Sequence, residues 1–352
     1  MIDAHVHLEK GDYTVEWIEQ FIDYAVKRNI DEIFFLEHTH IFKECCNIYN
    51  EMSVYNEYQK NWYQKKWEQA RPIKDYIDYI EKLKQIDFPI HLKFGLEVCY
   101  SPEHEIDIAQ IKQMYSFDFL VGSIHFIDGW AFSHLKQRWD KTDYDIDELY
   151  EKYYARMLSL INSGLFSGLA HPQSLQCYGA YPQKDYSHTY LQLAQALCSN
   201  GMYVEESSGL AINYGDKQLG MNPDMLECMV KCNVPILTAS DAHSPQNVGL
   251  YIKEMNDLIQ SLEEAGIAIG ELTLFGIYSG EDGIITYLNG DICCVTGIIF
   301  KTTVYSGEIR NNTEEVLEHR FFNKTNLPDN INKYDTRIVI DWTKDLQQVI
   351  VD

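Results

Sequence analysis

MIDAHVHLEK, residues 1–10, places two histidines one residue apart at the end of a short apolar run. The run from Ile2 to Val6 has the composition of a β-strand, and side chains two positions apart in a strand point to the same face. His5 and His7 can therefore hold one metal ion together. Imidazole ligands suit zinc, iron or manganese, and this spacing offers no thiolate.

Six further β-rich runs follow the first one, most of them separated by helical periods. They are EIFFLEH (32–38), LKFGLEV (92–98), DFLVGSIH (118–125), FSGLAH (166–171), MYVEESS (202–208) and PILTAS (235–240). The first helical period spaces Val15, Ile18, Ile22 and Ala25 three or four residues apart. Strand–helix alternation predicts a parallel sheet with right-handed crossovers. Seven such units over about 265 residues favour a barrel over an open sheet.

Residues with metal-binding side chains stand where these strands are expected to end. They are His5 and His7, Glu37 and His38, Glu97, His125, His171, and Asp241 with His243. Barrel enzymes build their sites at the carboxyl ends of the strands, where the loops converge. A bridging carboxylate such as Glu97 would let a second ion bind about 3.5–4 Å from the first. The sequence therefore predicts a cluster of metal ions at one mouth of the barrel.

The motifs DAHVH, LEHTH, GLEVCY, GSIHF, LAHP and SDAHSPQNVG resemble the signature of the PHP (polymerase and histidinol phosphatase) family, and their order resembles its histidinol-phosphatase branch. The resemblance covers about residues 1–265 and implies an α/β fold, a distorted (β/α)7 TIM-like barrel with two or three divalent ions. By this resemblance, one ion is held by His5, His7, Glu97 and Asp241, and a second by Glu97, His125 and His171. The third is held by His38, His243 and one more residue from the first loop.

The missing ligand of the third ion departs from the family pattern. Relatives often supply a histidine seven or eight residues after the first one, and here that register gives Asp12 or Tyr13. Glu9, two residues after His7 and on the same side of the strand, is the preferred replacement, with Asp12 as the alternative.

The resemblance implies a hydrolase that acts on a small-molecule phosphomonoester, with a hydroxide held between the ions as nucleophile. Asp241 would take up its proton, Glu97 would bridge two ions, and His243 would help to hold the ion that neutralises the phosphate oxygens. Histidinol phosphate is the substrate of the branch that the motifs resemble. Gln173, Gln176 and Ala211 stand where basic, phosphate-gripping residues are expected, so the partner is predicted only as a small phosphorylated metabolite.

Two other functions fit part of the pattern, namely a phosphodiesterase or nuclease and a metal-binding regulatory protein with little activity. A formal net charge of −24 disfavours nucleic acids and anionic lipid as partners. The apolar runs are too short to span a bilayer. The nine cysteines contain no CxxC pair, and their odd number indicates reduced thiols and a cytoplasmic location.

Two segments lie outside the barrel pattern. Cys45–Ala70 is a polar, helical insertion with six aromatic residues, and it is either a flap with aromatic core contacts or a lid that faces the substrate. Residues 268–352 resemble the carboxyl-terminal half of a Nudix hydrolase, although only Glu263–Gly266 echoes its catalytic box. The sequence thus predicts a phosphoesterase barrel over 1–267 and a degenerate, non-catalytic α+β appendage over 268–352, which covers the barrel or forms a homodimer contact.

Overall fold

The computed structural model describes most of the chain, in two compact units, Met1–Gln260 and Ser261–Asp352. The described residues are 1–139, 143–265, 267–269, 273–279, 284–286, 292–294, 296–302, 305–307, 320–344 and 349–351. The domain boundary after residue 267 stays a prediction.

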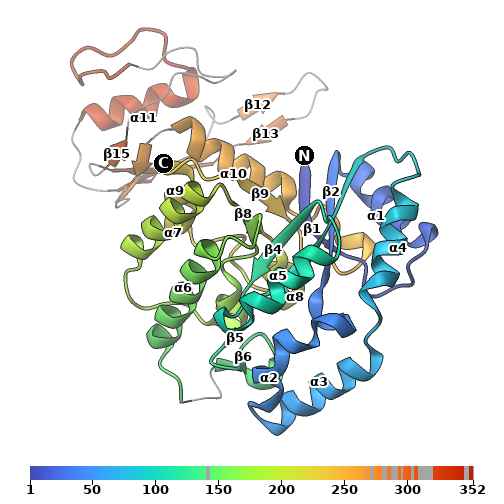
Figure 1. Ribbon diagram of the computed structural model, residues 1–352. Helices are drawn as coiled ribbons and strands as arrows, with labels where there is room; N and C mark the ends of the chain where they lie inside the picture. Colours follow the sequence, from blue (N-terminus) through green and yellow to red (C-terminus); the bar gives the residue numbers. More distant parts are fainter. Residues whose placement is uncertain are drawn as a thin grey trace. The chain divides into compact units, whose positions relative to one another are not determined.

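Seven parallel strands form a nearly closed barrel in the first unit (Figure 1). In sheet order they are β1 (Ile2–His7), β2 (Glu32–His38), β3 (His91–Cys99), β4 (Phe119–Ser123), β7 (Gly168–Leu169), β8 (Tyr203–Ser207) and β9 (Ile236–Ala239). The chain after β9 returns to β1, where the His7 amide donates to the Ala242 carbonyl at 2.8 Å and the Thr238 hydroxyl donates to the Ile2 carbonyl at 2.8 Å. The seven predicted strands and the α/β barrel are confirmed.

Helices cover the outside of the barrel (Figure 1). They are α1 (Val15–Lys27), α4 (Ile73–Leu83), α5 (Glu105–Met114), α6 (Ile146–Asn162), α7 (Ser187–Asn200), α9 (Pro223–Lys231) and α10 (Ile252–Ala265), with the short α8 (Gly209–Tyr214) after β8. Helix α1 begins after Thr14, whose side chain accepts the Trp17 amide. Its predicted apolar stripe is confirmed, since Ile18, Ile22 and Ala25 are buried.

The inside of the barrel is filled by apolar side chains below the carboxyl ends of the strands. This cluster consists of Ala4, Phe34, Leu36, Phe119, Val121, Ala170 and Ala239. In β2 the row Phe34, Leu36 and His38 runs along one face, so the inward face changes from apolar to polar at the end of the strand. The pairing of β1 with β2 shifts register between Asp3 and Val6. This irregularity includes His5 and re-aims the side chains of β1 at its first histidine.

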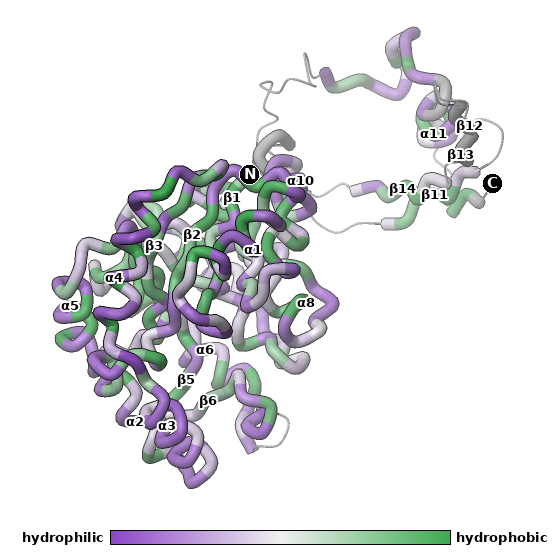
Figure 2. The backbone as a smooth tube through the Cα atoms, turned by 90° about the vertical axis from the view of Figure 1, so that its right-hand side faces the viewer, coloured by the Kyte–Doolittle hydropathy of each residue, from purple (hydrophilic) through white to green (hydrophobic). Residues whose placement is uncertain are grey.

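The Cys45–Ala70 insertion contains two helices, α2 (Asn50–Val54) and α3 (Glu57–Gln69). Both lie beside the hairpin of β5 (Phe126–Ile127) and β6 (Trp130–Ala131) in two perpendicular views (Figures 1 and 2). The tube of α3 is largely hydrophilic, whereas the barrel strands are largely hydrophobic (Figure 2). Tyr49 and Tyr63 are nevertheless buried, which confirms the predicted aromatic core contacts of this insertion.

The second unit contains short strands and one helix among its described residues. Strand β11 (Thr273–Tyr278) pairs with β14 (Gly297–Lys301) and β16 (Ile350–Val351), β10 (Ile267–Ile269) pairs with β15 (Tyr305–Gly307), and β12 (Ile284–Thr286) pairs with β13 (Ile292–Cys294). Helix α11 spans Lys333–Thr343. Gly266 of the Nudix-box echo lies outside the described residues. Across the part of the chain that is described, no helix has both the length and the apolar character to cross a membrane.

Candidate metal centre

The Glu97 carboxylate lies at the centre of a group of imidazoles. Five ring nitrogens lie within 3.6 Å of its oxygens, the Nε2 atoms of His5, His7, His38, His125 and His171. Its two oxygens divide this group. Oε1 faces His171 at 3.1 Å and His125 at 3.6 Å, whereas Oε2 faces the other three at 3.2–3.5 Å. Because each oxygen has its own set of nitrogen neighbours, the carboxylate can bridge two cations.

Asp241 is the second carboxylate of the site. Its Oδ1 atom lies 3.5 Å from His7 Nε2, 3.8 Å from His5 Nε2 and 3.6 Å from His243 Nδ1. Although burial disfavours the charged form, the neighbouring imidazoles of His243 and His7 hold the pKa of Asp241 below its usual range. The backbone φ of Asp241 is +52°, which is unusual for a non-glycine residue, and the loop after β9 therefore fixes this carboxylate in a strained position.

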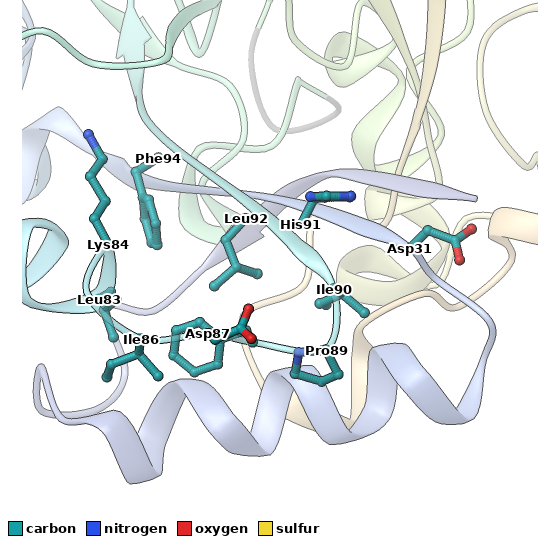
Figure 3. A pocket seen from close by; sticks show the side chains of 11 residues that line it. Asp31, Leu83, Lys84, Ile86, Asp87, Pro89, Ile90, His91, Leu92 and Phe94 are labelled. Atoms are coloured by element: carbon teal, nitrogen blue, oxygen red, sulfur yellow. The ribbon is translucent and has the colours of Figure 1, made fainter.

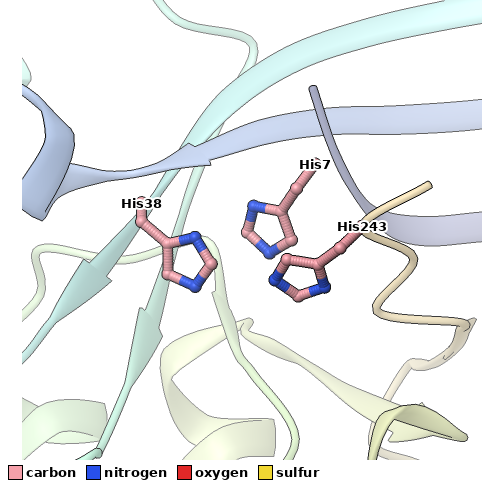
Figure 4. Close-up of side chains that lie close together, drawn as sticks. All are labelled: His7, His38 and His243. Carbon is pink, nitrogen blue, oxygen red and sulfur yellow. The ribbon is translucent and has the colours of Figure 1, made fainter. Parts of the chain in front are cut away.

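His7, His38 and His243 form a third group, which Figure 4 shows with the three rings turned toward one another. The His7 ring stacks on His38 at 4.0 Å and on His243 at 4.4 Å between centroids. Glu9 borders this group, with Oε2 at 3.2 Å from His38 Nδ1 and Oε1 at 3.9 Å from His243 Nε2. Asp12 is exposed to solvent. The position of Glu9 therefore favours it over Asp12 as a ligand.

The charges and lone pairs of this cluster suit cations. The Nε2 atoms of His5 and His7 lie only 2.9 Å apart, and Glu97 Oε2 is buried without a hydrogen bond. Burial, together with the nearby His38 and His243, lowers the pKa of His7, so its imidazole is neutral and offers a lone pair. Neutral imidazoles and carboxylates are the ligands that zinc, iron and manganese share. The histidines and glutamates can thus bind metal in three groups, and His7 and Glu97 each belong to two of them.

The comparison with protein families gives one match over most of the barrel. The model of the PHP domain matches residues 3–208. The chain belongs to the PHP family. Asp241 and His243 lie beyond the matched residues, and the closure of the barrel brings them to the same site as the histidines of β1.

Relatives of this PHP protein include a "Probable histidinol-phosphatase" of Deinococcus radiodurans, 24% identical over 211 residues, which are 56% of this chain and 77% of the relative. The chain is also similar to the crystal structure of a Lactococcus lactis histidinol phosphate phosphatase complexed with zinc, L-histidinol and phosphate. That match has 17% identity and a TM-score of 0.56, and covers 74% of this chain and 93% of the other. A Listeria monocytogenes structure matches at 14% identity and a TM-score of 0.54, over 71% and 97% of the two chains. At these identities, the structural matches support the fold.

Glu205 of this PHP domain is a site residue that the sequence analysis missed. Its carboxylate accepts the Nδ1 proton of His5 at 2.9–3.0 Å, and Oε2 also accepts the backbone amide of His171 at 3.1 Å. Glu205 is fully buried in β8. The signal was present in MYVEESS, because two adjacent acids in a buried strand must point to opposite faces, and one of them then enters the barrel.

Glu206 is the acid of that pair on the other face of β8. It is buried and accepts the Met221 amide at 2.9 Å, while its Oε1 atom has no hydrogen bond. Burial raises the pKa of Glu206 to about 7. The folded protein therefore keeps a proton on Glu206 at a pH where the unfolded chain has released it.

We expect the stability of the protein to depend on pH through Glu206. The pKa of Glu206 rises from 4.5 to about 7 on folding. The free energy of unfolding should therefore fall by about 3 kcal/mol as the pH increases from about 4.5 through about 7. Glu206→Gln cannot titrate, so the difference in unfolding free energy between wild type and variant should change by this amount between about pH 5 and about pH 8. Urea titrations at both pH values measure it, and a constant difference would contradict the assignment.

Two serines and one tyrosine complete the surroundings of the metal centre. Ser174 Oγ lies 2.6 Å from His171 Nδ1, and Ser123 Oγ lies 3.3 Å from His125 Nδ1. Such contacts fix the tautomer and orientation of an imidazole ligand. Glu37, which precedes His38, accepts the Tyr13 hydroxyl on its Oε1 atom at 3.4 Å. Burial disfavours the charged carboxylate and raises the pKa of Glu37, and the nearby Glu9 carboxylate raises it further.

A larger cavity lies away from the metal centre. It has a volume of about 460 Å³ and is lined by the segment from Leu83 to Phe94 and by Asp31 (Figure 3). His91 and Asp31 stand at the amino ends of β3 and β2, whereas Glu97 and His38 stand near their carboxyl ends. Barrel enzymes carry out their chemistry at the carboxyl ends of the strands. We therefore assign the function to the metal centre and not to this larger cavity.

Proposed function

We propose that this protein is a metal-dependent phosphoesterase that hydrolyses the phosphomonoester of a small molecule. The observation that carries the proposal is the Glu97 carboxylate, whose two oxygens face separate sets of imidazoles at 3.1–3.6 Å. Two cations bridged by one carboxylate can stabilise both the attacking and the leaving oxygen of a phosphoryl group. Membership of the PHP family and similarity to a probable histidinol-phosphatase support the same class of reaction.

We propose that nine residues hold two or three divalent ions, either zinc, iron or manganese. These residues are His5, His7, Glu9, His38, Glu97, His125, His171, Asp241 and His243. When bound, such ions would polarise the phosphate oxygens and lower the pKa of a coordinated water.

The side chains themselves would orient the substrate and move its protons. Asp241 would accept the proton of the attacking water, because its Oδ1 atom lies 3.5 Å from His7 Nε2 and 3.8 Å from His5 Nε2, in the same cluster as Glu97. The backbone carbonyl of Asp241 lies 3.0 Å from His243 Nδ1 and sets the orientation of that ring. His243 would in turn face the phosphate oxygens together with His38.

The substrate is proposed only as a small phosphorylated metabolite. Gln173 uses its side-chain amide to donate to the Ser207 carbonyl at 2.7 Å, and Gln176 is buried. Neither of them replaces the charge-assisted grip of an arginine on phosphate. A formal net charge of −24 also opposes a polyanionic substrate such as DNA.

One panel of assays tests this function. Purified protein with measured metal content is given p-nitrophenyl phosphate, bis(p-nitrophenyl) phosphate and histidinol phosphate. Hydrolysis of a monoester that disappears after chelation and returns with zinc, iron or manganese is the expected result. Faster hydrolysis of the bis-ester would instead indicate a phosphodiesterase, and bound metal without turnover of any ester would indicate a regulatory protein.

Gly209 offers a test of the role of Asp241. A methyl group added at Gly209 would lie 2.4 Å from Asp241 Oδ2, so the carboxylate must move in Gly209→Ala. We expect monoester hydrolysis to fall about 100-fold, since displacements of about 1 Å at a reacting centre have effects of this size. Steady-state kinetics measure the change, with Ala211→Ser in the same short helix as control. Equal kcat/KM values for wild type and Gly209→Ala would contradict the role of Asp241.

We further propose that residues 268–352 are a non-catalytic, Nudix-like appendage that makes a homodimer contact, and that the protein is cytoplasmic. Seven of the nine cysteines, from Cys45 to Cys232, are free thiols, which is compatible with a reducing compartment. Light scattering of the full chain and of residues 1–267 tests the dimer. If residues 1–267 alone formed a dimer, the contact would lie in the barrel and not in residues 268–352.

A further inference from the structure

A smaller cavity of about 180 Å³ adjoins the metal centre and extends away from it. One part of its lining comes from the metal centre, namely His38, Glu97 and His125. The other part includes Trp62 of α3, which belongs to the insertion, and His134, which follows β6. A phosphate held at the metal centre would thus have its leaving group in this cavity.

The walls beyond the metal centre are flat rings. The Trp62 ring lies 4.7 Å from the His134 ring and 5.4 Å from the His40 ring, measured between centroids. Tyr63 stands edge-on to Trp62 at 4.8 Å, and its hydroxyl is directed to the Met52 sulfur at 3.4 Å. Aromatic walls of this kind favour planar groups through stacked and edge-to-face contacts.

Two ring nitrogens of the walls have no hydrogen-bond partner. His40 Nε2 and His134 Nδ1 are buried and make no hydrogen bond. Burial and the Lys66 ammonium lower the pKa of His134 to about 4, so its ring is uncharged near neutral pH. Of the described residues that line the cavity, Glu97 alone carries a carboxylate, ammonium or guanidinium group. Because the Glu97 oxygens face the imidazoles of the metal centre, a cationic leaving group among the rings would be desolvated without a carboxylate beside it.

The insertion that carries Trp62 is fixed to the barrel. Gln59 of α3 is fully buried, and its amide donates to the Gly129 carbonyl at 2.7 Å and to the Met52 carbonyl at 2.9 Å. Its oxygen accepts the Ala131 amide at 3.1 Å. Since all of these bonds are made inside the protein, α3 is held against the β5–β6 hairpin. The ring walls are thus formed before a ligand arrives.

We propose that this cavity, the Trp62 slot, binds the leaving group of the substrate and selects an uncharged, planar, single-ring alcohol. The inference rests on the proposed phosphomonoesterase function and adds the chemical class of its substrate. A cavity of about 150 Å³ holds benzene in an engineered protein, so a volume of 180 Å³ accommodates one ring with a small substituent. His40 and His134 would hydrogen-bond a neutral polar substituent on that ring.

Three alkyl phosphates, each with an alkoxide leaving group, test the slot on the full, metal-loaded chain. They are benzyl phosphate, 4-(aminomethyl)benzyl phosphate and glycerol 2-phosphate. We expect kcat/KM to be at least about tenfold higher for benzyl phosphate than for each of the others, because the second adds an ammonium group and the third lacks a ring. Trp62→Ala should lower kcat/KM for benzyl phosphate about 10- to 100-fold, while glycerol 2-phosphate changes less than about threefold.

A matched variant and a binding measurement complete the test. Trp67→Ala removes a tryptophan from the same helix outside the slot and should keep the preference for benzyl phosphate. Calorimetry with benzylphosphonate, which is not hydrolysed, should show a similar loss of affinity in Trp62→Ala. Equal kcat/KM values for the three esters, or equal effects of Trp62→Ala on all of them, would overturn the slot but leave the proposed function. No hydrolysis of any ester would overturn the function itself.

Discussion

Replacing Glu97 with glutamine is expected to remove at least one equivalent of metal and to lower monoester hydrolysis about 1000-fold or more, which corresponds to about 4 kcal/mol of transition-state stabilisation. Glu97 has this effect because it is the common neighbour of five imidazoles, with nitrogens at 3.1–3.6 Å from its two oxygens. The amide of glutamine keeps one accepting oxygen and puts an NH2 group in place of the other. One of the two sets of imidazoles then faces a donor instead of a carboxylate oxygen.

Elemental analysis and steady-state kinetics on the same sample measure both effects. Glu19→Gln, an exposed position of α1, controls for the change of net charge and should behave as wild type. Retention of the full metal content in Glu97→Gln would show that Glu97 does not bridge two ions. Loss of metal with retained activity would separate hydrolysis from the metal centre and contradict the proposed function.

The strands could be predicted because a parallel barrel needs apolar runs that end in loops. β2 was predicted with its observed bounds, Glu32–His38. Four runs were predicted longer than the strands that form, and in two of them the strand ends before a histidine of the candidate site. The FSGLAH run yields only Gly168–Leu169, and His171 has a φ of +24°, so the chain leaves the extended conformation before the histidine. DFLVGSIH ends as a strand at Ser123, and His125 therefore stands in the loop beyond β4.

The residues proposed to bind metal could be predicted because they stand at or just after the ends of strands, and the carboxyl ends of parallel strands meet at one edge of the barrel. The nine predicted residues do lie together, since each of them contacts Glu97, Asp241, His38 or His243. Their division into groups was harder to predict. His7 belongs to two of the three groups, because its ring lies 4.0 Å from the His38 ring and 4.4 Å from the His243 ring while its Nε2 atom lies 3.5 Å from Glu97 Oε2.

Contacts between distant segments were not predictable from spacing. Glu205 contacts His5, 200 positions away along the chain, and the orientation of β8 decides whether Glu205 or Glu206 enters the barrel. The insertion raised the same difficulty. Tyr63 is buried, which confirms a flap with core contacts, and both Tyr63 and Trp62 line the cavity beside the metal centre. The alternative, a lid that faces the substrate, stays a prediction.

We expect Glu205→Gln to lower the affinity for metal about 10- to 100-fold. The wild-type carboxylate accepts from two donors, the Nδ1 proton of His5 at 2.9–3.0 Å and the backbone amide of His171 at 3.1 Å. In this way it holds the His5 tautomer whose Nε2 lone pair points toward Glu97 and His7. Glutamine has one accepting oxygen, so it can serve one of these donors while its NH2 group meets the other.

Isothermal titration of the metal-free protein with zinc measures this effect without relying on activity. Glu206→Gln is the matched control, since it makes the same chemical change at the next residue, on the other face of β8, where Met221 and not a histidine is the partner. Zinc affinity should fall in Glu205→Gln and remain within about threefold of wild type in Glu206→Gln. If both variants lost affinity equally, the effect would come from general damage to β8. Unchanged affinity in Glu205→Gln would show that His5 keeps its tautomer without this carboxylate, and that Glu205 only fills the barrel.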